Sequence, residues 1–159
     1  MIWKRGQATI ERLLAEREIE LVGVSTDLAE QLVAQARAHL NSAETVVSID
    51  PEGAFQLAYD AARKACTALL AVQGLRATTR GGHRAVQEAV VDQFDGPSGS
   101  EAFRAFGRLR RLRAQAEYPG VERPSLTFED VSDGIAAAAR VVADATALLD
   151  SGQVTPFPR

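Results

Sequence analysis

The sequence contains a single cysteine, Cys66, among 159 residues. A disulfide within the chain is therefore impossible, and a zinc cluster built from thiolates is excluded. Lysine is also scarce, and aromatic residues make up only 6% of the chain. Because alanine favours helices while aromatic and β-branched residues favour strands, this alanine-rich chain is typical of closely packed helices.

No run of about 18 consecutive apolar residues occurs, so we expect no membrane span. The N-terminus lacks the apolar stretch of a signal peptide, and the cytoplasm is the expected compartment. The hydrophobic fraction of 46% and the charged fraction of 25% are ordinary for a folded protein. At this length we expect one domain that buries its own core.

Apolar residues recur at intervals of three and four, which is the spacing of one face of a helix. We predict helices over residues 7–18, 26 to about 47, 51 to Gly74, 83 to about 94, 101–117, and from 128 to before Gly152. Side chains suited to capping precede most of them, namely Ser25 or Thr26, Asp50, Ser98 or Ser100, and Thr127 with Asp130.

Short connections between long amphipathic helices favour antiparallel neighbours. The expected fold class is therefore all-α, an antiparallel up-and-down bundle of four to five core helices plus a short N-terminal helix. We divide the chain into an N-terminal helix and connector (1–24), the bundle (25–152) and a loose C-terminal tail (153–159). No strand pattern of useful length is present.

Positive charge is concentrated in two segments, although the net charge is −3. Residues 61–87 and 102–116 contain no acidic residue, and each contains five of the 18 basic residues. Such segregation produces a local positive field on an acidic protein, which favours an anionic ligand. The alternative is two solvated helix faces.

The predicted fifth helix places an arginine on its apolar face. Phe106, Leu109 and Arg113 lie at i, i+3 and i+7, and so share one side. An unpaired buried charge is costly, so Arg113 needs a partner. That partner is a carboxylate of the fold, a backbone carbonyl, or an external phosphate at a subunit interface.

Two segments together resemble the HEPN family. The first runs from Tyr59 through Arg63 and Lys64 to Arg76, and the second contains Gly81-Gly82-His83 followed by Leu109-Arg110-Arg111-Leu112-Arg113-Ala114-Gln115-Ala116-Glu117-Tyr118-Pro119. The resemblance covers roughly residues 26–150 and is closest to a stand-alone bacterial branch. The shared order of these motifs is its main support.

This resemblance implies a helical bundle that dimerises, often with metal-independent ribonuclease activity. The family signature is an arginine, a short polar spacer and a histidine, and two signatures meet across the dimer. The arginine would hold the scissile phosphate and the histidine would move the proton of the RNA 2′-hydroxyl. Other members of the family only bind ligands or act as toxin–antitoxin components.

The chain departs from the active signature at two positions. Arg113 fits the arginine, but Ala114 replaces the polar spacer residue and Tyr118 replaces the histidine. A general base works best with a pKa near the operating pH, and a free tyrosine titrates near pH 10. The sequence thus leaves enzymatic activity open and argues against efficient ribonuclease activity.

Two other groups are candidates for the site. His83 follows two glycines at a helix start, where free N–H groups favour anions, but its spacing with Val86 and Val90 also suits a core histidine bonded to the backbone. Tyr59 and Arg63, at i and i+4, form either a packing contact or a wall of an anion cleft. With two histidines and no paired acidic motif, we expect neither a metal nor another cofactor.

Three functional hypotheses follow. The first is a homodimeric HEPN-like module that binds nucleic acid or a nucleotide through Arg110, Arg113, Arg63, Lys64, Arg76, Arg80, His83 and Tyr59. The second is a metal-independent endoribonuclease that uses Arg113 with Tyr118 or His83. The third is a protein-interaction partner of the toxin–antitoxin type.

Overall fold

The structure is a computed structural model that describes residues 3, 5–95, 101–118, 120 and 125–159. In chain order its elements are α1 (Gln7–Ala15), β1 (Ile19–Leu21), α2 (Thr26–Val46), α3 (Pro51–Gln73), β2 (Leu75–Ala77), α4 (Gly82–Phe94), α5 (Ala102–Glu117) and α6 (Phe128–Asp150). The expected all-α class is confirmed, and each predicted helix is present. The caps predicted at Ser98 or Ser100 lie outside the described residues.

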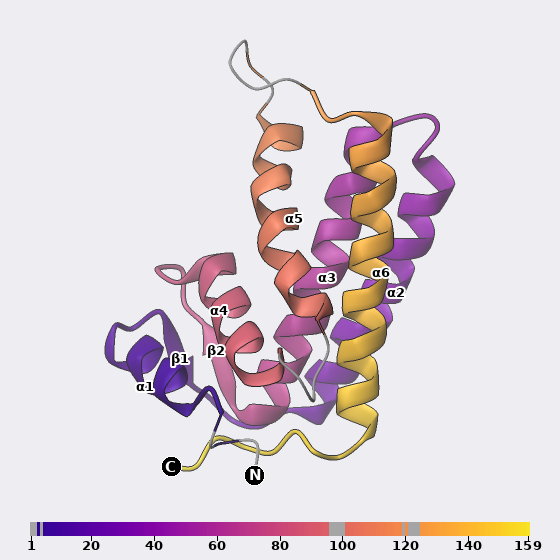
Figure 1. Cartoon of the computed structure of the whole chain (residues 1–159). Helices are drawn as coiled ribbons and strands as arrows, with labels where there is room; N and C mark the ends of the chain where they lie inside the picture. Colours follow the sequence, from indigo (N-terminus) through magenta and orange to yellow (C-terminus); the bar gives the residue numbers. More distant parts are fainter. Residues whose placement is uncertain (1–2, 4, 96–100, 119, 121–124) are drawn as a thin grey trace.

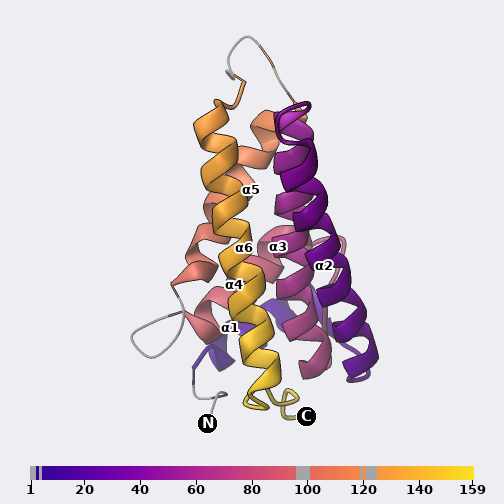
Figure 2. The ribbon, with the colours of Figure 1, turned by 90° about the vertical axis from the view of Figure 1, so that its right-hand side faces the viewer.

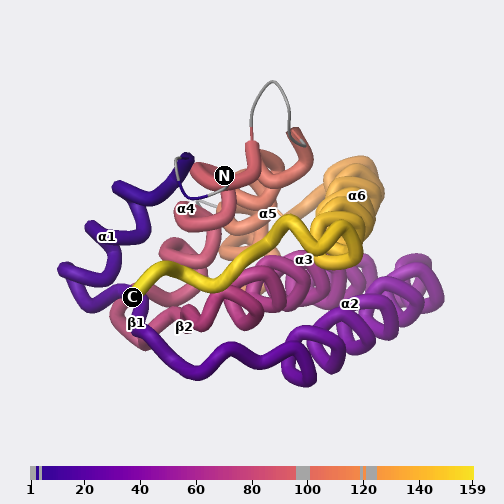
Figure 3. Tube along the Cα trace, turned by 90° about the horizontal axis from the view of Figure 1, so that it is seen from below, coloured from indigo at the N-terminus to yellow at the C-terminus, as the bar shows by residue number. Residues whose placement is uncertain are grey.

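Four long helices form an up-and-down bundle around α3. Helices α2 and α5 run in one direction, and α3 and α6 run in the other (Figure 1). A quarter turn of the molecule shows α6 and α2 on either side of α3 (Figure 2). Seen from below, α1 lies at the edge of the molecule beside α4, away from α2 and α6 (Figure 3).

Local sequence accounts for most helix ends. Ser25 and Asp50 each accept a hydrogen bond from the backbone N–H three residues further on, at 3.1 and 3.0 Å. Thr127 and Asp130 form the expected reciprocal capping box. Gly74 ends α3 with φ of +73°, a left-handed conformation that costs glycine little.

The two short strands were not expected, because residues 21–24 and 76–82 look like a connector and a basic loop. Strands β1 and β2 pair antiparallel, with Ile19 opposite Ala77 and Leu21 opposite Leu75. Each strand has three residues, too few for an alternating pattern to stand out in the sequence. This two-stranded sheet joins the N-terminal segment to the connection between α3 and α4.

The C-terminal residues 153–159 contact the rest of the protein, where the sequence suggests a loose tail. The Phe157 N–H donates to the Gln73 carbonyl at 2.9 Å, and the Phe157 ring meets Trp3 edge-on at 4.9 Å between centroids. The Trp3 indole N–H also donates to Thr155 Oγ1 at 3.0 Å. These contacts join segments from opposite ends of the chain, which local patterns do not reveal.

The core is centred on α3, whose alanines let its neighbours approach closely. Phe55 and Tyr59 are its largest buried side chains. Cys66 is fully buried with a free thiol, and burial raises its pKa, so it is a core residue without nucleophilic character. Gly134 of α6 faces Phe55: a Cβ there would lie 2.5 Å from Phe55 Cε2.

We expect Gly134→Ala to destabilise the protein because the Phe55 ring must shift to admit the methyl group. Overpacking costs about 1–3 kcal/mol, and the better helix propensity of alanine returns about 1 kcal/mol. The free energy of unfolding in urea should therefore fall by about 1 kcal/mol. Gly23→Ala is the control, since no heavy atom lies within 4 Å of the added Cβ. A more stable Gly134→Ala protein would contradict this packing.

Candidate functional site

A tyrosine from α3 and a histidine from α4 meet in a polar contact. Tyr59 Oη lies 2.8 Å from His83 Nδ1, and the two ring centroids are 5.5 Å apart. Tyr59 also stacks on Phe106 of α5, with 5.6 Å between centroids and 10° between ring planes. The phenol is therefore fixed between two helices, and His83 is bonded to this side chain through one ring nitrogen.

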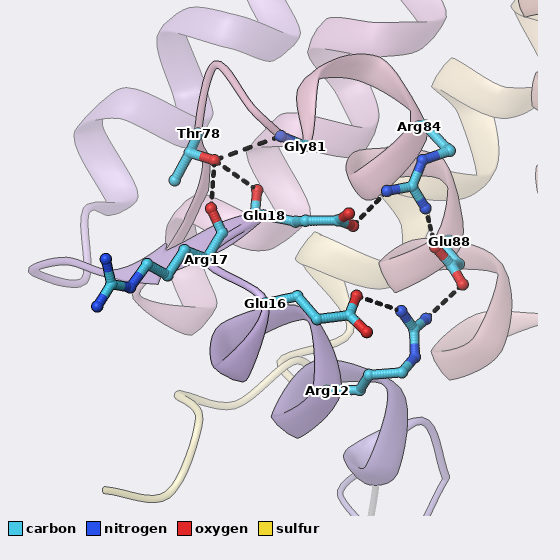
Figure 4. A network of polar contacts seen from close by, with 8 residues as sticks. All are labelled: Arg12, Glu16, Arg17, Glu18, Thr78, Gly81, Arg84 and Glu88. Carbon is cyan, nitrogen blue, oxygen red and sulfur yellow. Dashed lines mark hydrogen bonds and ion pairs between the residues drawn. The ribbon is translucent and has the colours of Figure 1, made fainter.

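The turn that leads into α4 is held by the N-terminal segment. Thr78 Oγ1 donates to the Arg17 carbonyl at 2.7 Å and accepts the Gly81 N–H at 3.3 Å (Figure 4). Gly81 approaches Glu18 so closely that a Cβ there would overlap the Glu18 carbonyl oxygen. A side chain does not fit there, so glycine at this position sets where the helix with His83 begins.

Ion pairs extend this support across α1 and α4. Arg84 bridges Glu18 and Glu88, at 2.8 Å to the latter, and Arg12 bridges Glu88 and Glu16, at 2.9 Å to the latter (Figure 4). Exposed pairs contribute little singly, but Glu18 is only 13% exposed and belongs to a network. The residue next to His83 is thereby tied to the N-terminal segment.

Arg113 of α5 has a partner within its own helix and lies over the site. Its Nη2 is 2.8 Å from Glu117 Oε2, and its Cζ lies 5.4 Å from the centroid of the Tyr59 ring. The side chain is 34% exposed. The apolar stripe of α5 therefore presents a cation that is half-shielded by an aromatic ring, an arrangement that is attractive for a desolvated guanidinium.

Asp60 connects α3 to α2 beside this cation. Arg63 Nε donates to Asp60 Oδ1 at 3.0 Å, while His39 Nδ1 lies 3.0 Å and Lys64 Nζ 3.5 Å from Oδ2. Burial opposes ionisation of Asp60, but the hydrogen bond from Arg63 and the neighbouring positive charges together lower its pKa. Asp60 is thus a carboxylate at neutral pH.

Tyr59, Arg63, His83 and Arg113 line one pocket of about 310 Å³, together with Gln56 and Asp60. Burial, with the positive charges of Arg63 and Arg113, lowers the pKa of His83. Burial raises the pKa of Tyr59 to about 12, against the effect of the same arginines. At neutral pH the pocket therefore contains a neutral imidazole and a neutral phenol between two guanidinium groups.

The structure brings only part of the predicted residue set to this pocket. Arg110 is near it, and its Nε donates to Gln87 Oε1 at 3.1 Å. Lys64 donates to Gln35 Oε1 at 2.7 Å, on the α2 side of Asp60. Three further predicted residues do not line the pocket: Arg76, which pairs with Glu20; Arg80, which is exposed before α4; and Tyr118, which is 65% exposed after α5.

Two residues of the pocket were not selected from the sequence. Asp60 lies three and four residues before Arg63 and Lys64, which is the spacing of ion pairs on a helix and a usable signal. Gln56 lies one turn before Asp60 on the same face, but a polar residue on an exposed face is too common to be informative.

A family model described as HEPN domain matches residues 29–148. The chain belongs to the HEPN family. No curated protein and no solved structure matches it. Within the described part of this HEPN domain, no group of three or more His, Cys, Asp and Glu side chains is arranged to hold a metal ion, and no helix is long and apolar enough to cross a membrane.

We expect the His83 ring to titrate below its ordinary pKa of 6.5, as followed by NMR of the ring protons. Arg113→Gln should raise the midpoint because it removes a positive charge from the pocket. His39→Gln assigns the two histidine signals.

Because the folded state binds this proton less tightly than the unfolded chain, the contribution of His83 to stability falls as the pH drops through about 6.5. A midpoint above 6.5 would contradict the geometry.

Proposed function

We propose that this HEPN domain binds a phosphate-bearing ligand, RNA or a nucleotide, at the pocket between α3, α4 and α5. The observation that carries the proposal is the convergence of Arg63, His83 and Arg113 around Tyr59. Arg63 lies on α3, His83 on α4 and Arg113 on α5, so the fold brings together residues that are 20 or more positions apart in sequence. We also propose that the working unit is a homodimer, as it is for other members of the family.

The chemistry of the pocket supports an anion. Each guanidinium offers several N–H donors in a planar fork that matches phosphate, and Arg113 gives only one end to Glu117. His83 is bonded to Tyr59 through Nδ1, and its Nε2 has no hydrogen-bond partner among the described residues. Asp60 is the competing acid: it holds Arg63, so a bound phosphate must share that guanidinium with it.

We expect Arg113→Gln to weaken binding of a short RNA by about tenfold to a hundredfold, the loss for one charge-assisted hydrogen bond. Fluorescence anisotropy at several salt concentrations measures the affinity and its salt dependence. The slope of log K against log salt should also fall by about one. Arg111→Gln is the matched control, since it removes the same charge from an exposed position on the same helix. If both variants lose RNA affinity equally, the protein attracts RNA through its overall positive charge and not through this pocket.

A specific observation favours ribonuclease activity as the second candidate. The signature position holds Tyr118, but a neutral histidine from α4 lies in the pocket with Arg113. With Nδ1–H donating to Tyr59 Oη, the unprotonated Nε2 of His83 would accept the 2′-hydroxyl proton while the arginines hold the scissile phosphate. The 2′-oxygen would form the new bond to phosphorus, and the 5′-oxygen of the next nucleotide would leave and take a proton from water. Tyr118, which is not a lining residue, would take no part in this reaction.

RNA cleavage in the presence of a chelator tests this candidate. His83→Gln should lower the cleavage rate by about 10²–10⁴, the usual contribution of a general base, and Tyr118→Phe should leave it unchanged. If RNA stays intact in the presence of the native protein, the ribonuclease candidate is rejected and the proposal of a binding module stands. Cleavage that survives His83→Gln assigns the reaction to another residue or a contaminant.

A further inference from the structure

Helices α4 and α5 share a second polar contact, one turn away from the residues that line the pocket. Gln87 follows His83 by four residues and lies on the same face of α4. Arg110 precedes Arg113 by three residues and lies on the same face of α5. Between the two helices, the Arg110 Nε–H donates to Gln87 Oε1 at 3.1 Å. This contact fixes Arg110 beside the pocket.

Gly107 makes room for this contact. It is buried on α5, and a Cβ there would lie 2.5 Å from Gln87 Nε2 and 3.1 Å from Gln87 Cδ. Any side chain at this position would push the amide of Gln87 away from α5. Glycine is unfavourable inside a helix, but here it lets the amide lie against the helix that carries Arg110.

The positive charge of Arg110 is held without being neutralised. The two arginines that line the pocket are each paired with a carboxylate. Arg110 is half-buried and has no acidic partner among the described residues, because the group that fixes it is a neutral amide. Its terminal Nη nitrogens make no hydrogen bond to another described residue, so they can donate to a phosphate.

The charge of Arg110 acts on the residues of the pocket. Burial is the main cause of the lowered pKa of His83, and the charge of Arg110 adds to it together with the two lining arginines. The same guanidinium opposes the rise in the pKa of Tyr59 that burial causes. The titration of His83 therefore reports where the Arg110 side chain lies.

We propose that Gln87 is a positioning residue: by accepting the Arg110 Nε–H, it holds that guanidinium at the edge of the pocket, where the terminal nitrogens bind the phosphate of the ligand. A guanidinium that is already fixed loses less side-chain entropy when it binds. Gly107 contributes the space in which the amide lies. This inference rests on the proposed function and adds a third cation together with the residue that places it.

Titration of His83 by NMR in the absence of RNA tests the position of Arg110. Gln87→Met removes the acceptor at similar side-chain volume, and Gly107→Ala displaces it without changing any charge. In both variants Arg110 should move into solvent, and the midpoint of His83 should rise toward 6.5. Gln31→Met is the matched control: Gln31 is exposed on α2, and its substitution should leave the midpoint as in the native protein.

Fluorescence anisotropy with the short RNA tests the effect on binding. Gln87→Met and Gly107→Ala should each weaken binding by about twofold to tenfold, the loss expected when the ligand must immobilise one flexible side chain. Arg110→Gln should weaken binding at least as much. In the Arg110→Gln background, Gln87→Met should cause no further loss, because Gln87 acts through Arg110.

Circular dichroism verifies that the variants are folded. Gly107→Ala is the safer of the two main variants, because the added methyl group displaces only the flexible end of Gln87 and alanine is the better helix former.

Two results would overturn the inference. The first is an unchanged His83 midpoint in both variants, since Arg110 then keeps its place without the amide. The second is an equal loss of RNA affinity from Gln87→Met with and without Arg110, since Gln87 then acts by itself. If the native protein binds no RNA at low salt, the proposed function fails, whereas a raised midpoint in the two variants still supports the placement of Arg110 by Gln87.

Discussion

Helix α3 must contact another element on almost every side, and this requirement determines where polar chemistry is possible. Thirteen of its residues are buried, and seven of these are alanines that permit close approach of α2, α5 and α6. A narrow strip remains accessible, and it contains Gln56, Asp60, Arg63 and Lys64. The pocket lies on this strip because it is the part of the central helix that packing leaves open.

The electrostatics of the pocket are a balance between cations and the acids that hold them. Asp60 fixes Arg63 and Glu117 contacts Arg113, so neither guanidinium is an isolated buried charge in the absence of ligand. The same acids reduce the positive potential that a phosphate experiences. A phosphate ligand of the proposed kind would therefore replace or share these existing contacts.

The imidazole of the pocket has an unusual dependence on distant sequence. His83 is the second residue of α4, and the turn before this helix is fastened to the N-terminal segment through Thr78, Gly81 and Glu18. Residues 1–28 lie outside the stretch that the family model matches. The N-terminal segment nevertheless supports the geometry of His83, because the turn that precedes α4 is bonded to it. The rest of α4 is attached to the bundle through Gln87 and Gln93, which bond to Arg110 and Gln73.

The sequence by itself determined the helices, because their signals are local: the capping side chains Asp50 and Thr127, the terminal Gly74, and apolar residues every three or four positions. It also nominated Arg113 and His83 singly, and Tyr59 with Arg63 as a pair on one face of a helix. Only the tertiary structure decided that these four share a pocket, that Tyr118 does not line it, and that two short strands join residues 56 positions apart. Helix ends depend on neighbours within one turn, whereas contacts between distant segments depend on how whole helices pack, which no local pattern encodes.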